Sequence, residues 1–326
     1  MATDRFAALD GWRAISILLV LAAHLLPLGP KPWDLNVAAG LFGMMLFFNL
    51  SGFLITHFML RSSRVRDFLI RRFTRILPLT WLYLAMVFAL YPVSSDTALA
   101  HVLFFANYPP KPLIPVTDHL WSICIEMHFY LGIALLVLLF RKSGLLLLPL
   151  FCIGFTLLRV FDGVHYSVIT HYRIDEILAG AVLALIYHNH LGQRIKQLIL
   201  RINPAWVLFL LLLSVHPDSG FIQYFRPYLA AMLIGITLLD TNRAPFLQHR
   251  VLAYIGTISF ALYVLHPLLA STWLGSNEDF GKYVKRPLLF AVLFICAHVS
   301  TFYYERPWIT LGRRLSYRFK LNPVTP

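Results

Sequence analysis

Residues 119–140 read His-Leu-Trp-Ser-Ile-Cys-Ile-Glu-Met-His-Phe-Tyr-Leu-Gly-Ile-Ala-Leu-Leu-Val-Leu-Leu-Phe. Glu126 carries the only carboxylate of this stretch, and the apolar residues run on without alternating with polar ones. A membrane-spanning helix needs about 20 mostly apolar residues. A transmembrane β-strand would show alternation instead. The stretch therefore predicts a helix that crosses a lipid bilayer.

Comparable apolar runs recur along the whole chain of 326 residues. Hydrophobic residues make up 59% of the chain and charged residues 13%. Soluble domains carry about 25% charged residues, so this composition excludes a soluble globular protein and a disordered chain. We predict an all-α polytopic membrane protein with about ten transmembrane helices. The ten stretches are 9–28, 37–60, 73–92, 119–140, 144–161, 173–189, 204–216, 226–240, 251–273 and 286–304.

The charges predict how the chain is oriented. The chain holds 28 Lys and Arg against 15 Asp and Glu, and basic residues favour cytoplasmic loops. With a cytoplasmic amino terminus, the inner loops hold more than twice as many basic residues as the outer segments, to which this count assigns Arg159, Arg173 and Arg226. We therefore expect both termini in the cytoplasm, contacts with membrane lipids and no nucleic-acid partner. No loop is long enough to fold alone, so we expect residues 1–326 to form one integral-membrane domain with no extra soluble domain.

The first apolar stretch contains two polar side chains that are costly inside a bilayer. Arg13 and His24 are eleven residues apart. On a helix this spacing returns to within roughly 20° of the same direction, about 16 Å further along the axis. One face would then carry a permanent cation and a titratable base at different depths. Either the two side chains are functional, or they only anchor the helix at the two membrane interfaces.

A second feature is the run of arginines before and inside the third stretch. Arg72 and Arg75 are three residues apart, so they point the same way on a helix. Orientation alone requires fewer charges than this run contains. Because a guanidinium group binds phosphate through two parallel hydrogen bonds, the pair predicts a site for an anionic phosphate ligand at the cytoplasmic side.

Glu126 is the only carboxylate well inside any of the ten stretches, and it shares a helix face with His119. It could orient a base, accept a proton, or pair with Arg13 for structure alone. Elsewhere the sequence predicts interfacial anchors or functional groups at 173–176 and 259–266, and close helix packing through Gly52. The three cysteines have no paired spacing and should be free thiols. We expect no metal site.

Taken together, these segments resemble the membrane-bound acyltransferase-3 family, the polysaccharide and lipopolysaccharide O-acyltransferases. The matching segments lie in the same order and cover nearly the whole chain. His128 stands where the family often has Gln, and many members carry an additional esterase-like domain. The segments that carry the resemblance are Leu9-Asp10-Gly11-Trp12-Arg13-Ala14 with His24, Phe47 to Ile55, Arg72-Phe-Thr-Arg75-Ile-Leu-Pro78, His119 to Tyr130, Arg173-Ile-Asp175, Ser259 to His266, and Glu305-Arg306-Pro307.

The resemblance implies transfer of an acyl group across the bacterial inner membrane. The donor would be cytoplasmic acyl-CoA, with acetyl-CoA favoured, and the acceptor a sugar hydroxyl of an extracytoplasmic or lipid-linked glycan. Acyl-CoA would be a co-substrate, with no bound cofactor. The resemblance assigns catalysis to His24, Arg13 and Glu126, donor binding to Arg72 and Arg75, and acceptor or supporting roles to His119, Trp121, Asp175, Tyr263 and His266.

Under this interpretation His24 takes the proton of the attacking hydroxyl, or forms an acyl-histidine intermediate. Arg13 would steady the donor or the developing oxyanion. Two other classes of function remain open. A proton-coupled transporter or flippase would also place Arg, His and Glu inside its spans. A scaffold in an envelope complex would not need His24 at all.

Overall fold

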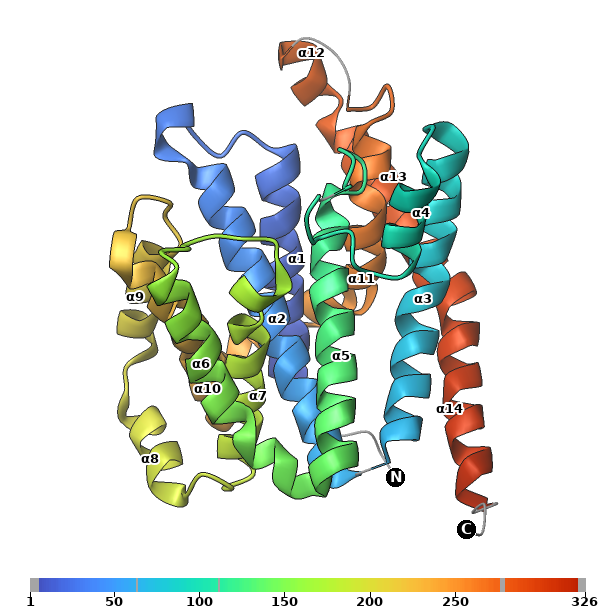
Figure 1. Cartoon of the computed structure of the whole chain (residues 1–326). Helices are drawn as coiled ribbons and strands as arrows, with labels where there is room; N and C mark the ends of the chain where they lie inside the picture. The colour runs from blue at the N-terminus through green and yellow to red at the C-terminus, as the bar shows by residue number, and fades with distance from the viewer. Residues whose placement is uncertain (1–5, 63, 111, 276–278, 322–326) are drawn as a thin grey trace. The chain divides into compact units, whose positions relative to one another are not determined.

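The computed structural model describes residues 6–62, 64–110, 112–275 and 279–321. Within these ranges most residues are helical and no strand occurs, which confirms the all-α class (Figure 1). Short 3-10 turns and one π-helix, Ser300–Glu305, connect the α-helices. The α-helices are α1 Ala7–Leu25, α2 Leu35–Arg61, α3 Val65–Leu90, α4 Ser95–Val102, α5 Trp121–Phe140, α6 Leu148–Phe161, α7 Asp175–Tyr187, α8 Gln193–Arg201, α9 Pro204–Ser214, α10 Arg226–Leu239, α11 Arg250–Ala270, α12 Asp279–Val284, α13 Arg286–Val299 and α14 Arg306–Leu321.

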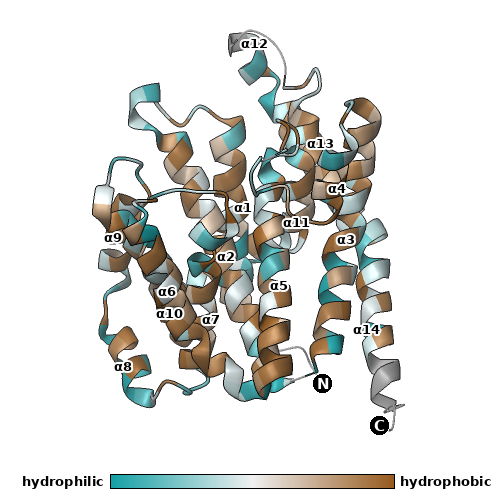
Figure 2. Cartoon of the chain, viewed as in Figure 1, coloured by the Kyte–Doolittle hydropathy of each residue, from teal (hydrophilic) through white to brown (hydrophobic). Residues whose placement is uncertain are grey.

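The described part of the chain has seven helical segments long and apolar enough to cross a membrane, or up to eight if the bent pair of α8 and α9 counts as one span. The number is below the ten stretches expected partly because α6 is counted with α5 in one segment, Asp118–Phe161. Helix α7, with 13 residues, and α9, with 11, are each shorter than the about 20 residues that a span needs. Hydrophobic residues predominate in most helices, as the brown colouring shows (Figure 2). The protein is an integral, multi-pass membrane protein, and the side faced by its termini stays a prediction.

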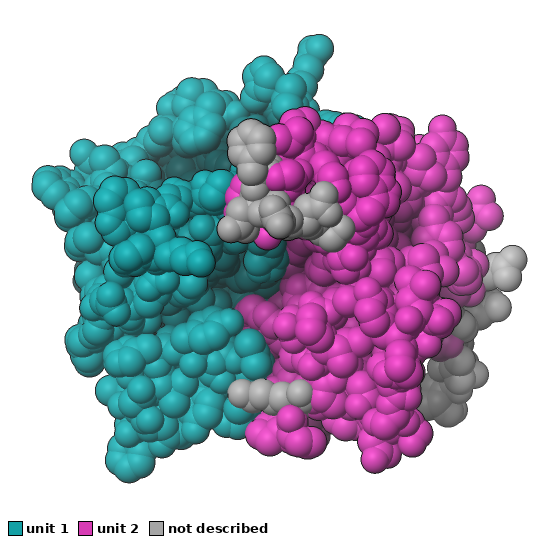
Figure 3. Space-filling view, turned by 90° about the horizontal axis from the view of Figure 1, so that it is seen from above, with its two compact units in different colours: residues 1–60, 142–259 teal, residues 61–141, 260–326 magenta. Residues whose placement is uncertain are grey.

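The chain forms two compact units, coloured separately in Figure 3. Unit 1 contains residues 1–60 and 142–259, and unit 2 contains residues 61–141 and 260–326. Unit 1 therefore includes α1 and the helices from α6 to α10. Unit 2 includes α3, α5 and α14.

In the core of unit 1, α1 packs closely against its neighbours, and at one position only a glycine fits. Gly11 of α1 lies so close to the Leu247 carbonyl that a Cβ atom there would overlap it. The next residue, Trp12, is buried and donates from Nε1 to Thr237 Oγ1 of α10 at 2.8 Å. On the neighbouring helix α2, Gly52 lies against the backbone of α7. The packing predicted for Gly52 is therefore confirmed, since small residues let helix backbones approach closely.

Unit 2 is organised around α3, which packs along α14. A Cβ atom on Gly312 of α14 would overlap Thr74 of α3. Nearby, Arg71 Nε donates to Ser316 Oγ at 2.9 Å, which ties the same two helices together. Tyr304 donates from its hydroxyl to the carbonyl of Pro78 at 3.2 Å. These contacts fix the rotation of α3 about its axis, and therefore the direction of the two arginines predicted to bind phosphate.

Candidate functional site

The two arginines of α3 are the most prominent polar groups of unit 2. Arg72 and Arg75 are both half-buried. Neither side chain makes a hydrogen bond or an ion pair with any residue that the structure describes. The charges of Arg72, Glu126 and Glu305 act on Arg75. Two guanidinium groups in a membrane-spanning helix thus retain their hydrogen-bond donors for another partner.

Tyr130 of α5 forms a platform beneath Arg72. The guanidinium carbon of Arg72 lies 5.8 Å from the centroid of the Tyr130 ring, within the range of a cation–π interaction. Phe68, one helical turn before Arg72, packs edge-on against the same ring at 5.7 Å. The Tyr130 hydroxyl donates to Glu126 Oε1 at 2.6 Å, and both residues are buried. The spacing of four residues within each helix brings these groups onto facing surfaces.

Glu305 is another buried carboxylate of unit 2 and ends the π-helix Ser300–Glu305. The hydroxyl groups of Ser300 and Thr301 donate to its Oε1 at 3.0 and 3.2 Å. π-Helices are rare in proteins, and those that occur are often found at functional sites. The carboxylate accepts two hydroxyl groups and acts electrostatically on Arg75.

These residues together can bind an anion. Guanidinium groups bind phosphate and carboxylate oxygens, and Arg72 and Arg75 offer theirs from one helix face. The two carboxylates partly offset the positive charge, which lowers the cost of keeping two arginines inside the protein. Glu126 was expected to orient a base, to accept a proton or to pair with Arg13, and each of these roles stays a prediction. The structure adds Tyr130 as one hydrogen-bond donor to Glu126.

A second polar cluster of unit 2 joins the start of α5 to α11. The structure brings His119 together with Tyr263 and His266, a contact that the spacing within either segment could not predict. The ring centroids of His119 lie 5.2 Å from Tyr263 and 5.4 Å from His266. Ser122 Oγ and the Tyr263 hydroxyl share a hydrogen bond of 2.6 Å, and Tyr263 donates to the carbonyl of His119.

The histidines of this cluster also contact the backbone. His119 Nε2 lies 3.2 Å from the carbonyl of Val264, and His266 Nδ1 lies 2.7 Å from that of Tyr263. Both histidines are buried, whereas Trp121 is half-buried at the first position of α5. Two hydroxyl groups and two imidazoles in one cluster could bind a polar acceptor. Ser122 was not among the predicted residues, because a lone serine in an apolar stretch carries no signal of its own.

In unit 1, helix α1 is uninterrupted from Ala7 to Leu25, as the shared face of Arg13 and His24 requires. Arg13 Nη1 forms an ion pair with Asp10 Oδ1 at 3.6 Å. The partner of Arg13 in this ion pair therefore comes from the same helix, because Asp10 lies one helical turn before Arg13. The His24 side chain is exposed in the last turn of α1.

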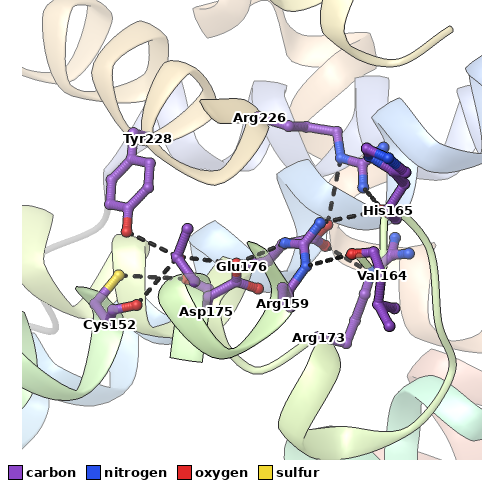
Figure 4. A network of polar contacts seen from close by, with 10 residues as sticks. Cys152, Arg159, Val164, His165, Arg173, Asp175, Glu176, Arg226 and Tyr228 are labelled. Atoms are coloured by element: carbon purple, nitrogen blue, oxygen red, sulfur yellow. Dashed lines mark hydrogen bonds and ion pairs between the residues drawn. The ribbon is translucent and has the colours of Figure 1, made fainter. Parts of the chain in front are cut away.

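Unit 1 also contains a buried charge network that surrounds Asp175 (Figure 4). Arg159 Nη1 donates to Asp175 Oδ2 at 2.6 Å, and Arg159 Nη2 donates to the carbonyl of His165 at 3.1 Å. Glu176 forms ion pairs with Arg173 at 3.1 Å and with Arg226 at 3.7 Å. All five charged side chains are at most 1% exposed.

The three arginines that the topology count places with the outer segments, Arg159, Arg173 and Arg226, form part of this network, and the side of the membrane on which they lie stays a prediction. Their side chains are buried, because Asp175 and Glu176 balance part of their charge and tyrosine rings cover two of the guanidinium groups. Arg159 lies 5.5 Å from the ring centroid of Tyr224, and Arg173 lies 5.1 Å from that of Tyr166. The position of Arg159 inside the apolar stretch 144–161 was the one feature of the sequence that could have indicated its burial. Asp175, proposed to support an acceptor, is held by this network.

No group of three or more His, Cys, Asp or Glu side chains suited to a metal ion occurs among the residues that the structure describes. His188 pairs with His57, whose Nδ1 lies 2.9 Å from His188 Nε2. The three cysteines are free.

Comparison with known proteins adds independent findings. A peptidoglycan O-acetyltransferase of Listeria monocytogenes serovar 1/2a, OatA, is 26% identical over 359 residues, which cover 92% of this chain and 55% of that protein. A Bacillus subtilis (strain 168) protein, YrhL, named provisionally as a peptidoglycan O-acetyltransferase, is 26% identical over 94% of this chain and 55% of its own length. The chain thus spans about half the length of these relatives. No solved structure matches. The family model described as an acyltransferase domain matches residues 6–306, so this chain belongs to the acyltransferase-3 family.

Proposed function

We propose that this protein is a membrane O-acetyltransferase of the bacterial inner membrane. The donor is cytoplasmic acyl-CoA, specifically acetyl-CoA, and the acceptor is a sugar hydroxyl of an extracytoplasmic or lipid-linked glycan. The names of its relatives favour peptidoglycan as that glycan. The family membership supports the acyl-transfer chemistry.

The observation that supports the proposal best is the availability of the guanidinium groups of Arg72 and Arg75. Both are half-buried in α3 and make no hydrogen bond or ion pair with a described residue. Guanidinium donors that remain unused inside a membrane protein are costly unless a ligand uses them. Coenzyme A presents several phosphate oxygens, which suit two adjacent guanidinium groups. Glu126 acts as a positioning residue through Tyr130, the platform of Arg72.

In the proposed reaction, the acceptor hydroxyl attacks the thioester carbonyl while His24 takes the hydroxyl proton. The new C–O bond forms, the C–S bond breaks, and the proton passes to the departing sulfur, so that free coenzyme A leaves. Arg13 stabilises the negative charge that develops on the carbonyl oxygen. An acyl-histidine intermediate at His24 would divide the same transfer into two steps. The cluster of His119, Tyr263 and His266, with Trp121 nearby, binds the acceptor sugar through hydroxyl and imidazole groups.

The direct test uses purified full-length protein, radiolabelled acetyl-CoA and a peptidoglycan acceptor. We expect label on the glycan with wild-type protein and none with His24→Ala, provided that this variant keeps the wild-type melting temperature. Alkaline treatment should release the label as acetate, since an ester is cleaved. A folded His24→Ala variant with full transfer would reject the proposed base.

The donor site is tested separately by calorimetric titration with coenzyme A. Arg72→Ala and Arg75→Ala should each weaken binding, most clearly at physiological salt, where exposed charges are screened. Equal affinity of the variants and the wild type would remove these residues from the donor site. Substrate-driven proton flux without any label transfer would support the carrier hypothesis instead.

A further inference from the structure

Helices α8 and α9 form a fixed corner in unit 1. Their axes differ by 85° across the two residues between them. Asn203 caps α9 by accepting a hydrogen bond from the backbone nitrogen of Ala205 at 2.9 Å. Arg243 donates to the carbonyls of Leu200 and Ile202 at 2.6 and 2.9 Å, at the end of α8. These contacts hold the bend in place, so the angle between α8 and α9 is fixed by hydrogen bonds and the link is not a flexible loop.

Helix α9 has the surface of a lipid-facing helix. Its 11 residues extend about 16 Å, half the thickness of the hydrocarbon core. Trp206, close to its first residue, is 67% exposed, and tryptophan favours the depth of the lipid headgroups. With α9 placed along the membrane normal, a helix at 85° to it at that depth runs close to the membrane plane. The other large apolar side chains exposed on α9 are Leu208, Phe209, Leu210, Leu212 and Leu213.

Helix α8 has an apolar strip and a basic strip side by side. Figure 2 shows both hydrophobic and hydrophilic colours on it. Ile199 is buried against the core of unit 1, whereas Ile195 and Leu198 are exposed. Arg194 and Arg201, seven residues apart, share a face next to Leu198. A short helix with this arrangement is typical of the membrane interface.

The basic strip has no counter-charge of its own. The segment 191–203 contains no Asp or Glu. Arg194 and Arg201 are exposed and make no hydrogen bond or ion pair with a described residue. The third basic side chain of the helix, Lys196, lies 5.5 Å from the ring centroid of Tyr187. Two guanidinium groups therefore remain available beside an apolar strip at headgroup depth.

We propose that α8 is a binding surface for anionic phospholipid. Ile195 and Leu198 enter the acyl-chain boundary, and Arg194 and Arg201 bind the phosphates of anionic headgroups. Guanidinium groups bind phosphate oxygens in pairs, and the absence of acidic residues in the segment favours lipids with net negative charge over zwitterionic ones. The surface lies outside the residues proposed for acyl transfer, so it stands independently of that function.

The depth of α8 is tested on the full-length protein in nanodiscs that contain phosphatidylglycerol and phosphatidylcholine. Single nitroxide labels are placed by Ile195→Cys, Leu198→Cys, Gln193→Cys and Gln197→Cys in a Cys296→Ser background, since Cys124 and Cys152 are buried. We expect oxygen to relax the labels at 195 and 198 more strongly, and a water-soluble nickel complex to relax those at 193 and 197. Equal nickel accessibility at all four positions would overturn the proposal. So would spin–spin broadening at 195 and 198, which would identify a second copy of the chain as the partner.

The charge preference is tested by the ratio of phosphatidylglycerol to phosphatidylcholine that stays bound in native mass spectrometry. A basic side chain near an anionic surface contributes about 1 kcal/mol, or roughly a five-fold preference. The double variant Arg194→Gln/Arg201→Gln should lose a several-fold preference for phosphatidylglycerol. The matched variant Arg194→Lys/Arg201→Lys keeps both charges and should keep most of it. An unchanged ratio in the glutamine variant would overturn the proposal.

Discussion

Gly52 of α2 and Gly180 of α7 lie against each other's helix backbone. A Cβ atom on Gly52 would overlap the carbonyl oxygen of Ile177, and one on Gly180 would overlap the carbonyl oxygen of Asn49. The contact is therefore reciprocal, and neither helix has room for a methyl group. Such contacts between small residues drive helix association where lipid removes the ordinary hydrophobic driving force.

We expect Gly52→Ala and Gly180→Ala each to destabilise the protein by about 1–3 kcal/mol, because the added methyl group forces two backbones apart. The melting temperature of the purified protein in detergent measures the effect. Gly154→Ala is the matched control in the same unit, since a Cβ atom there meets nothing within 4 Å. A melting temperature of Gly180→Ala equal to that of the control would contradict the close contact.

The sequence predicted one side of this contact but could not supply the other. Gly52 follows Ser51 inside an apolar stretch, and two adjacent small residues there indicate a close approach of helices. Nothing local in the sequence pairs it with Gly180, because residues far apart in the chain meet only after the helices pack. The same limit applies to the cluster of His119 and Tyr263, where each spacing was visible and their contact was not.

The charge network of unit 1 shows a different limit of sequence analysis. The topology count used Arg159, Arg173 and Arg226 only as charges on one side of the membrane, and such a count does not say whether a side chain is buried. In the structure, Asp175 and Glu176 compensate them inside the protein. Whether a charge is buried depends on its partner, and the partner of Arg159 lies on the next helix.

The platform of Arg72 predicts different effects for two substitutions of Tyr130. Tyr130→Leu removes the ring under the guanidinium group and should weaken coenzyme A binding several-fold, since a cation–π contact contributes about 0.5–2 kcal/mol. Tyr130→Phe keeps the ring but leaves the buried Glu126 without this donor, at a cost of about 1–3 kcal/mol in stability. Calorimetric titration and melting temperature separate the two losses. Equal affinity of Tyr130→Leu and wild type would show that the ring does not position Arg72.

The ion pair of Arg159 and Asp175 predicts a large, non-additive loss of stability. Asp175→Asn leaves a buried guanidinium group without its counter-charge, which should cost about 3–5 kcal/mol. The double variant Arg159→Met/Asp175→Asn should lose less than the sum of the two single variants, because neither charge is then left alone. Denaturant unfolding of the four proteins measures the coupling.

The control for this cycle is Asp162→Asn, which lies in the same segment. Asp162 is exposed and accepts a hydrogen bond from the Tyr172 hydroxyl at 2.7 Å, so its loss should change stability by little. An Asp175→Asn variant with wild-type stability but no acyl transfer would assign Asp175 to the substrate and not to the fold.

His101 predicts a pH dependence of stability that is independent of the proposed reaction. It is buried in α4, outside the candidate spans, with Nδ1 2.7 Å from the Thr97 carbonyl and Nε2 2.8 Å from Thr117 Oγ1. Burial lowers the pKa of His101 below its usual value of about 6.5, and the hydrogen bond to Thr97 offsets part of this shift. A base whose folded pKa is depressed resists protonation in the folded state. Its stabilising contribution is therefore complete above about pH 6.5 and is lost as the pH falls through the folded pKa.

We expect the melting temperature of the wild type to fall between pH 7.5 and pH 5.5 by more than that of His101→Gln. Glutamine offers the same two kinds of hydrogen-bonding group without a titratable proton, so the difference between the two proteins isolates His101 from the other histidines. The variant should thus be less stable than wild type at pH 7.5 and closer to it at pH 5.5. Parallel pH profiles would show that the imidazole of His101 titrates alike in the folded and unfolded chains.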